Sequence, residues 1–234
     1  MTIAQKIEKS QQDIEEIQYP PSDLESQEPP LESYLHLQQL LLLLKCLDWL
    51  WKDREDYFSA GNLSIYYSQT QDKSEDFRGP DFFVVLNTER QPRKSWVVWE
   101  EGGKYPHVII ELLSSSTAKI DRTDKKEIYQ DIFRTPDYFW FSPDTLEFQG
   151  FHLVDGEYQE IYPNEQGWRW SQQLQLFLGV YEQQLRFFNP EGVLVSTPEE
   201  AAKTAQEQLE LERQQKEKLV NKLRELNIDP DTLF

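Results

Sequence analysis

The chain alternates between stretches of helical periodicity and short apolar runs of strand length. Between residues 31 and 51 leucines recur at helical spacing, and Leu41 and Trp51 help to widen the apolar face nearly all round. Such a pattern predicts a helix that is buried or covered on several sides. Residues 121–133 return to the helical period, and residues 197–226 do so again. The pattern therefore predicts helices in these three segments.

Seven short runs of β-branched and aromatic residues predict strands. Turn residues such as Ser142-Pro143-Asp144 and Asp155-Gly156 separate some of them. Strands and a helix in this mixed order favour an α/β or α+β domain built on one sheet. The predicted strands are residues 63–67, 82–86, 96–99, 108–113, 138–141, 146–153 and 158–162.

The chain divides into three parts by its pattern. Residues 1–30 are polar, have no sustained period and end in two prolines, which predicts a loosely ordered arm. Residues 31–190 hold the mixed domain. Residues 191–234 contain the last helix, for which Pro198 suits the start and Asp229-Pro230-Asp231 suits the stop.

The last predicted helix carries apolar residues at the a and d positions of a heptad pattern, although Glu212 and Lys216 interrupt it. Two interpretations fit equally well. The helix could form a weak coiled coil that joins two copies of the chain, or it could be a solvated terminal helix packed on its own domain. The apolar a and d residues are Ala202, Ala205, Leu209, Leu219, Leu223 and Leu226.

Composition excludes several classes of protein. Cys46 is the only cysteine, which excludes a disulfide scaffold. The longest apolar run, Leu40 to Leu44, is far shorter than the about 18 residues that a membrane span needs. Residues 1–10 include charged side chains and no apolar stretch follows, so a secretory signal is not expected. The sequence therefore predicts a cytoplasmic protein without membrane spans.

The net charge of −18 at first argues against a nucleic-acid partner, because phosphate binding rests on Lys and Arg. Its distribution changes that picture. Residues 61–190 carry only −7 of the total, and the two flanking segments carry the remainder. Within residues 119–126 four basic side chains stand against two acidic ones. A nucleic-acid substrate is therefore compatible with the sequence, although its binding should be weak and sensitive to salt.

Two carboxylates mark a candidate site. Asp81 follows Gly79-Pro80 at the start of a predicted strand, and Glu111 lies inside the apolar strand 108–113. A carboxylate in a buried strand is costly unless a basic group pairs with it or a metal ion binds it. Taken alone, such a residue is more often part of a structural ion pair.

The following helix adds a third ionisable group. Its apolar face contains Ile128, Tyr129, Ile132 and Phe133. At about 100° per residue, Lys125 projects within roughly 10° of the centre of that face, while Lys126 lies about 90° away and should point to solvent. One lysine cannot neutralise both Asp81 and Glu111. A divalent cation would balance the remaining charge, and oxygen ligands of this kind suit Mg²⁺ or Mn²⁺.

An ordered series of motifs resembles the Uma-two family, whose members are endonuclease-like proteins of the PD-(D/E)XK restriction-endonuclease-like superfamily. The resemblance covers roughly residues 31–190. It implies a restriction-endonuclease-like core in which a central mixed sheet is flanked by helices. The motifs are Gly79-Pro80-Asp81, residues 108–117 (VIIELLSSST), Asp121-Arg122 with Lys125 and Tyr129, and residues 136–140 (PDYFW).

The resemblance implies that Asp81 and Glu111 ligate Mg²⁺ or Mn²⁺. It also implies that Lys125 supplies the basic group for hydrolysis of phosphodiester bonds in DNA. The superfamily places its lysine two residues after the second acid, where this chain has Leu113; in the Uma-two family the following helix supplies the base. Ser115 replaces a proline that the family usually has.

These two departures keep another interpretation open. The fold could serve as a catalytically inactive interaction or regulatory module, and hydrolysis of a smaller phosphoester is a third alternative. A homodimer would suit the cutting of both DNA strands.

Overall fold

The structure is a computed structural model that describes residues 24–26, 33–67, 77–114 and 124–226. The proposed arm is therefore described only at residues 24–26. Several residues named above, among them Ser115, Lys119, Asp121 and Arg122, lie outside the described residues.

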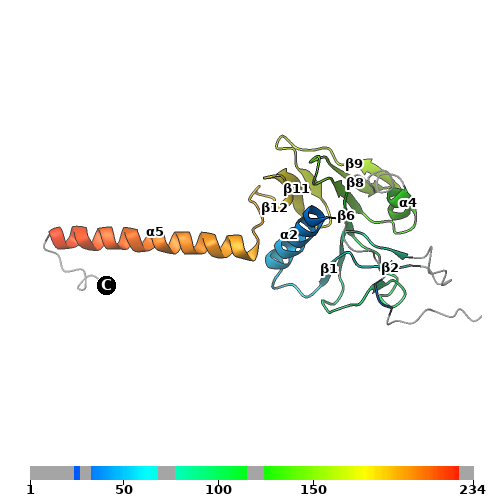
Figure 1. Cartoon of the computed structure of the whole chain (residues 1–234), viewed down its shortest axis with the longest axis horizontal. Helices are drawn as coiled ribbons and strands as arrows, with labels where there is room; N and C mark the ends of the chain where they lie inside the picture. Colours follow the sequence, from blue (N-terminus) through cyan, green and yellow to red (C-terminus); the bar gives the residue numbers. More distant parts are fainter. Residues whose placement is uncertain (1–23, 27–32, 68–76, 115–123, 227–234) are drawn as a thin grey trace, which may run out of the picture.

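A six-stranded mixed sheet forms the centre of the molecule (Figure 1). Its strand order is β1-β4-β6-β7-β8-β9. Strands β6 and β7 run parallel, and every other neighbouring pair runs antiparallel. The strands are β1 (Tyr57–Gly61), β4 (Phe82–Leu86), β6 (Val108–Leu112), β7 (Asp137–Phe141), β8 (Phe148–Val154) and β9 (Glu157–Glu160).

Different elements cover the two faces of this sheet. Helix α2 (Tyr34–Leu50) and a three-stranded sheet pack on one face. Helix α4 (Asp124–Asp131) and a second three-stranded sheet pack on the other. The first small sheet contains β10 (Arg169–Ser171), β11 (Leu176–Tyr181) and β12 (Gln184–Phe188), and the second contains β3 (Phe77–Arg78), β2 (Ile65–Tyr66) and β5 (Trp96–Val97).

This architecture is the predicted α+β class, with a central mixed sheet flanked by helices. The prediction of a single sheet was wrong, because the described residues form three. Apolar runs of strand length indicate that strands form but not which strands pair, so their division among three sheets is set by tertiary contacts.

Helix α2 buries one face rather than most of its circumference. Ser33 caps its start by accepting a hydrogen bond from the backbone N–H of His36. Leu43 and Leu47 are fully buried, whereas the side chains of Leu41 and Leu50 are 40% exposed. The prediction that this helix is covered on several sides was therefore wrong. A leucine-rich pattern predicts that a helix forms, but it does not predict how much of the helix surface other elements bury.

The described residues of the arm contact the outer sheet of β2 and β5. The Ser95 hydroxyl donates to the carbonyl of Leu24 at 2.7 Å, and Lys94 pairs with Glu25 at 2.7 Å. The Ser26 hydroxyl also lies 3.2 Å from that of Ser64.

Helix α5 (Pro198–Glu225) leaves the body as a long projection (Figure 1). Thr197 and Glu200 form a capping box at its start, and Arg186 binds both carboxylate oxygens of Glu200 at 3.0 and 2.7 Å. Residues 202–219 are exposed throughout. The interpretation of a helix packed along its own domain was therefore wrong beyond the first turn. No described helix is both long enough and apolar enough to cross a membrane.

A buried carboxylate ties the central sheet to the outer sheet of β10–β12. Asp137 begins β7 and is fully buried. One of its oxygens lies 2.6 Å from Nδ1 of His152 on β8. The other accepts from the Ser171 hydroxyl at 2.6 Å and from the backbone N–H of Gln173 at 2.9 Å. The acidic residue of the PDYFW motif is thus fully hydrogen-bonded within the fold.

Replacing Asp137 with alanine should destabilise the protein by about 2–4 kcal/mol, because the buried donors lose their acceptor. Urea denaturation followed by circular dichroism measures this change. Asp144→Ala, in an exposed turn, is the matched control and should change the free energy of unfolding by less than about 0.5 kcal/mol. A loss at Asp137 no larger than that of the control would contradict this role.

Candidate functional site

The pairing of β4 with β6 places the two predicted carboxylates side by side. Phe82 is opposite Ile110 in this antiparallel ladder, so the next step outward sets Asp81 opposite Glu111. Side chains alternate between the faces of a sheet. Glu111 therefore shares a face with Ile109, which belongs to the core beneath α4.

Glu111 is fully buried, and both of its carboxylate oxygens accept hydrogen bonds. The Tyr129 hydroxyl donates to Oε1 at 2.6 Å. Lys125 Nζ lies 3.1 Å from Oε2, and the backbone N–H of Asp81 donates to the same oxygen at 3.4 Å. These donors offset the cost of burying the charge.

Asp81 sits at the start of β4 and turns its carboxylate toward β6. Its Oδ2 accepts from the backbone N–H of Leu112 at 2.7 Å. Burial raises the pKa of the Asp81 carboxyl well above its usual range, and the nearby Glu111 carboxylate raises it further, while Lys125 and the Leu112 N–H act in the opposite direction. Among the described side chains, Lys125 is the one that forms an ion pair with Glu111, so these residues place one positive charge beside two carboxylates.

Helix α4 supplies the two side chains that bind Glu111. Lys125 and Tyr129 are four residues apart and lie on one face of the helix, which explains why both reach the same carboxylate. The sequence predicted Lys125 at this place. It put Tyr129 on the apolar face of the helix and among the family motifs, but gave it no role in the site. The i, i+4 spacing from Lys125 was the signal that could have identified Tyr129.

Two details of α4 differ from the prediction. Lys126 does not extend into solvent, because its Nζ lies 3.6 Å from the centre of the Phe151 ring. Burial there lowers the pKa of the Lys126 amine. Ile132 was expected on the buried face but is 47% exposed, since the helix ends at Asp131.

The superfamily's lysine position cannot supply a cation here. Leu113 is 1% exposed, and its backbone N–H donates to the carbonyl of Phe141. In the part of the chain that the structure describes, Lys125 is the basic side chain that reaches Glu111.

The donor set fits a hard divalent cation. Two carboxylates face each other, and Asp81 carries a raised pKa of the kind that a nearby positive charge would reverse. Magnesium keeps several waters and is commonly held by one or two carboxylates together with substrate phosphate. Within the described ranges no cluster of three or more His, Cys, Asp or Glu side chains could enclose a metal ion.

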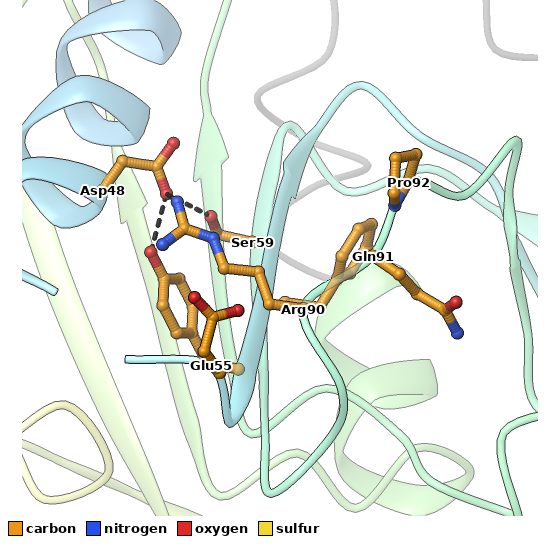
Figure 2. A pocket seen from close by; sticks show the side chains of 8 residues that line it. Asp48, Glu55, Ser59, Arg90, Gln91 and Pro92 are labelled. Atoms are coloured by element: carbon orange, nitrogen blue, oxygen red, sulfur yellow. Dashed lines mark hydrogen bonds and ion pairs between the residues drawn. The ribbon is translucent and has the colours of Figure 1, made fainter. Parts of the chain in front are cut away.

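A separate hollow lies beside the edge strand β1 (Figure 2). Asp48 is at its centre, and Oδ1 of this residue accepts from the Tyr57 hydroxyl at 2.9 Å and from Arg90 at 3.1 Å. The Arg90 guanidinium also lies over the Tyr57 ring. These groups satisfy one another and join α2, β1 and the segment after β4. We interpret this cluster as a structural tie.

A comparison with models of protein families shows the family to which the chain belongs. A model named Uma2 and described as "Putative restriction endonuclease" matches residues 6–186. The chain belongs to the Uma2 family. The Uma2 match begins within the predicted arm and ends before α5, and it confirms the resemblance drawn from the sequence motifs.

A solved structure is similar to this Uma2 protein. Its title is "Crystal structure of a putative nuclease belonging to DUF820 from Anabaena variabilis ATCC 29413". The two chains are 12% identical, with a TM-score of 0.47, and the match covers 63% of this chain and 77% of the other. Among proteins with curated descriptions, none matches this chain.

Replacing Asp81 with asparagine should stabilise the metal-free protein at neutral pH. Because its pKa is raised, Asp81 binds a proton more tightly in the native protein than in the unfolded chain. The contribution of Asp81 to the free energy of unfolding therefore falls as the pH rises from 3.8, the ordinary pKa, through the raised pKa of the native state. Asparagine keeps an acceptor for the Leu112 N–H. We expect a gain on the order of 1 kcal/mol at pH 7, which disappears below about pH 4.

Urea denaturation in EDTA at both pH values measures this difference. Asp53→Asn, at an exposed position, is the control and should show no gain at either pH. If Asp81→Asn were less stable than the parent protein at pH 7, the repulsion assigned to the carboxylate pair would be wrong.

Proposed function

We propose that this Uma2 protein is a metal-dependent endonuclease that hydrolyses phosphodiester bonds of DNA. In this proposal Asp81 and Glu111 hold Mg²⁺ or Mn²⁺, and Lys125 is the basic catalytic group. The observation that carries the proposal is the facing pair of carboxylates, with a lysine bound to one of them. Family membership supports a nuclease-type activity, and the metal dependence and the DNA substrate are what we propose beyond it.

The chemistry of such a site is hydrolysis by an activated water. A divalent cation held there polarises a phosphoryl oxygen and lowers the pKa of a bound water. Glu111 is held in one orientation by Tyr129 and Lys125, so its carboxylate is fixed before substrate arrives. Asp81 is fixed in the same way by the backbone N–H of Leu112.

Besides orienting Glu111, Lys125 acts on the water and the phosphate in this proposal. The Lys125 side chain is 24% exposed, so it lies at the boundary between the buried Glu111 and solvent. From there it can orient or deprotonate the attacking water, or offset the negative charge that develops on the phosphate.

The acidity of the chain sets how DNA would bind. A net charge of −18 repels phosphate, and electrostatic attraction must come from local basic groups. Of the basic cluster at residues 119–126, Lys125 and Lys126 are described, and Lys126 is half-buried over Phe151. We therefore expect weak, salt-sensitive binding to which the metal contributes.

The buried Leu113 favours a second candidate function, a catalytically inactive nuclease-fold protein that acts as an interaction or regulatory module. Such a module needs neither metal affinity nor the Lys125 amine. The two functions therefore predict different results in the same experiment.

The central experiment measures nicking of supercoiled plasmid DNA by the purified full chain in Mg²⁺ or Mn²⁺. Asp81→Asn, Glu111→Gln and Lys125→Met should each reduce the rate by about 100-fold or more, because each removes a charge from the reacting centre. Lys126→Met is the matched control, since it removes the neighbouring amine while keeping an apolar side chain over Phe151, and it should cut at nearly the parent rate.

Calorimetry with Mn²⁺ separates the two functions. Binding that Asp81→Asn abolishes supports the enzyme. An absence of Mn²⁺ affinity together with no nicking would favour the inactive module. Equal cleavage by the parent protein and the Asp81 or Glu111 variants would overturn the assignment of the site.

A further inference from the structure

The exposed helix α5 has a seam that a second copy of itself would complete. The a and d positions between residues 202 and 226 lie along one side of the helix. On this seam Leu209, Leu219 and Leu226 are 50%, 55% and 61% exposed, and Leu211, which lies off the seam, is also 55% exposed. Glu212 and Lys216 lie at the centre of the same seam.

The order of residues along the seam distinguishes the two orientations of a pair. In a parallel pair each seam residue meets its own copy, so Glu212 would face Glu212 and Lys216 would face Lys216. The two alanine positions would also meet alanines and leave gaps. Like charges and voids in the same seam make a parallel pair unfavourable.

An antiparallel pair resolves both problems at one alignment. Each a residue then lies opposite a d residue of the other copy. When residue 214 is at the twofold axis, all eight seam positions pair with one another in this way. Glu212 meets Lys216 of the partner subunit twice, and every small residue meets a large one. The remaining layers are Leu209 with Leu219, Ala205 with Leu223, and Ala202 with Leu226.

Net charge along the helix supports the same orientation. Residues 202–213 contain three acidic and two basic side chains, and residues 215–226 contain four basic and two acidic ones. The antiparallel alignment sets the acidic half against the basic half. Arg213 lies beside its own copy at the axis, but Glu210 and Glu217 are within one helical turn of it and offset that contact.

We propose that this protein forms a homodimer through an antiparallel coiled coil of α5, aligned with Glu212 opposite Lys216 of the partner subunit. The capping box and the pairing of Arg186 with Glu200 fix the start of the helix on the body. The overlap of residues 202–226 is about 37 Å long, at about 1.5 Å per residue. The two bodies therefore lie at opposite ends of the helix pair.

Charge reversal with sedimentation equilibrium of the full chain tests the alignment. Glu212→Lys and Lys216→Glu should each weaken the dimer about tenfold, because two attractive pairs become repulsive. The double variant E212K/K216E should restore the parent dissociation constant. Glu207→Lys reverses a charge on the outer side of the same helix, and as the control it should leave the constant unchanged.

Cysteine cross-linking tests the orientation independently, since Cys46 is buried and is the only cysteine of the chain. Under oxidising conditions the variant L209C/L219C should form a disulfide-linked dimer, and L209C alone should not. Cross-linking by L209C alone, single variants that the double variant does not rescue, or a protein that stays monomeric at all concentrations would each overturn the proposal. The last result would leave α5 as a surface for a different partner.

Discussion

The structure depends on the burial of one carboxylate in the middle of its central sheet. Glu111 is fully buried in β6, whose other residues are all apolar, and removing its charge from water is costly. The surrounding residues compensate by placing a lysine, a tyrosine hydroxyl and a backbone N–H around its two oxygens. Helix α4 must therefore lie where it does, because Lys125 and Tyr129 reach Glu111 only from that face of the sheet.

The two buried acidic sites of the sheet differ in how fully the described residues compensate their charge. Asp137, at the start of the neighbouring strand, is also buried, but each of its oxygens has a close partner within the fold. Among the described residues, Asp81 and Glu111 instead lie beside a single lysine, and the pKa of Asp81 is raised by burial and then by the Glu111 carboxylate. A fold that can satisfy one buried acid fully and leaves another pair short of charge favours a functional explanation for that pair.

The sequence could predict the parts of the fold that local patterns encode. The strand around Glu111, the inward direction of Lys125 and the long last helix all follow from periodicity. The facing of Asp81 and Glu111 also follows once β4 is paired with β6, although the sequence alone does not identify that pairing. Tyr129 was missed because a buried tyrosine resembles any core aromatic until its hydroxyl finds a partner.

Other features depend on tertiary packing that no local pattern carries. The strands β10–β12 carry apolar residues of their own. Their grouping into a separate sheet, packed in one core with α2 and the central sheet, is set by tertiary contacts. Lys126 was expected in solvent because a helical wheel places its Cβ correctly but does not show the Phe151 ring that its long side chain covers. The exposure of Leu41 on α2 has the same cause, since the coverage of a helix is set by its neighbours.

The geometry of α5 constrains what a dimer could do with this site. The body lies at the N-terminal end of α5 (Figure 1), so an antiparallel pair holds the two sites at least about 37 Å apart. Opposite-strand phosphates a few base pairs apart are much closer than this, since B-DNA rises about 3.4 Å per base pair. The sequence suggested that a homodimer would cut both DNA strands at one place. A dimer of this form does not bring its two sites close enough for that. It suits two independent cuts, or the holding of two DNA segments by one assembly.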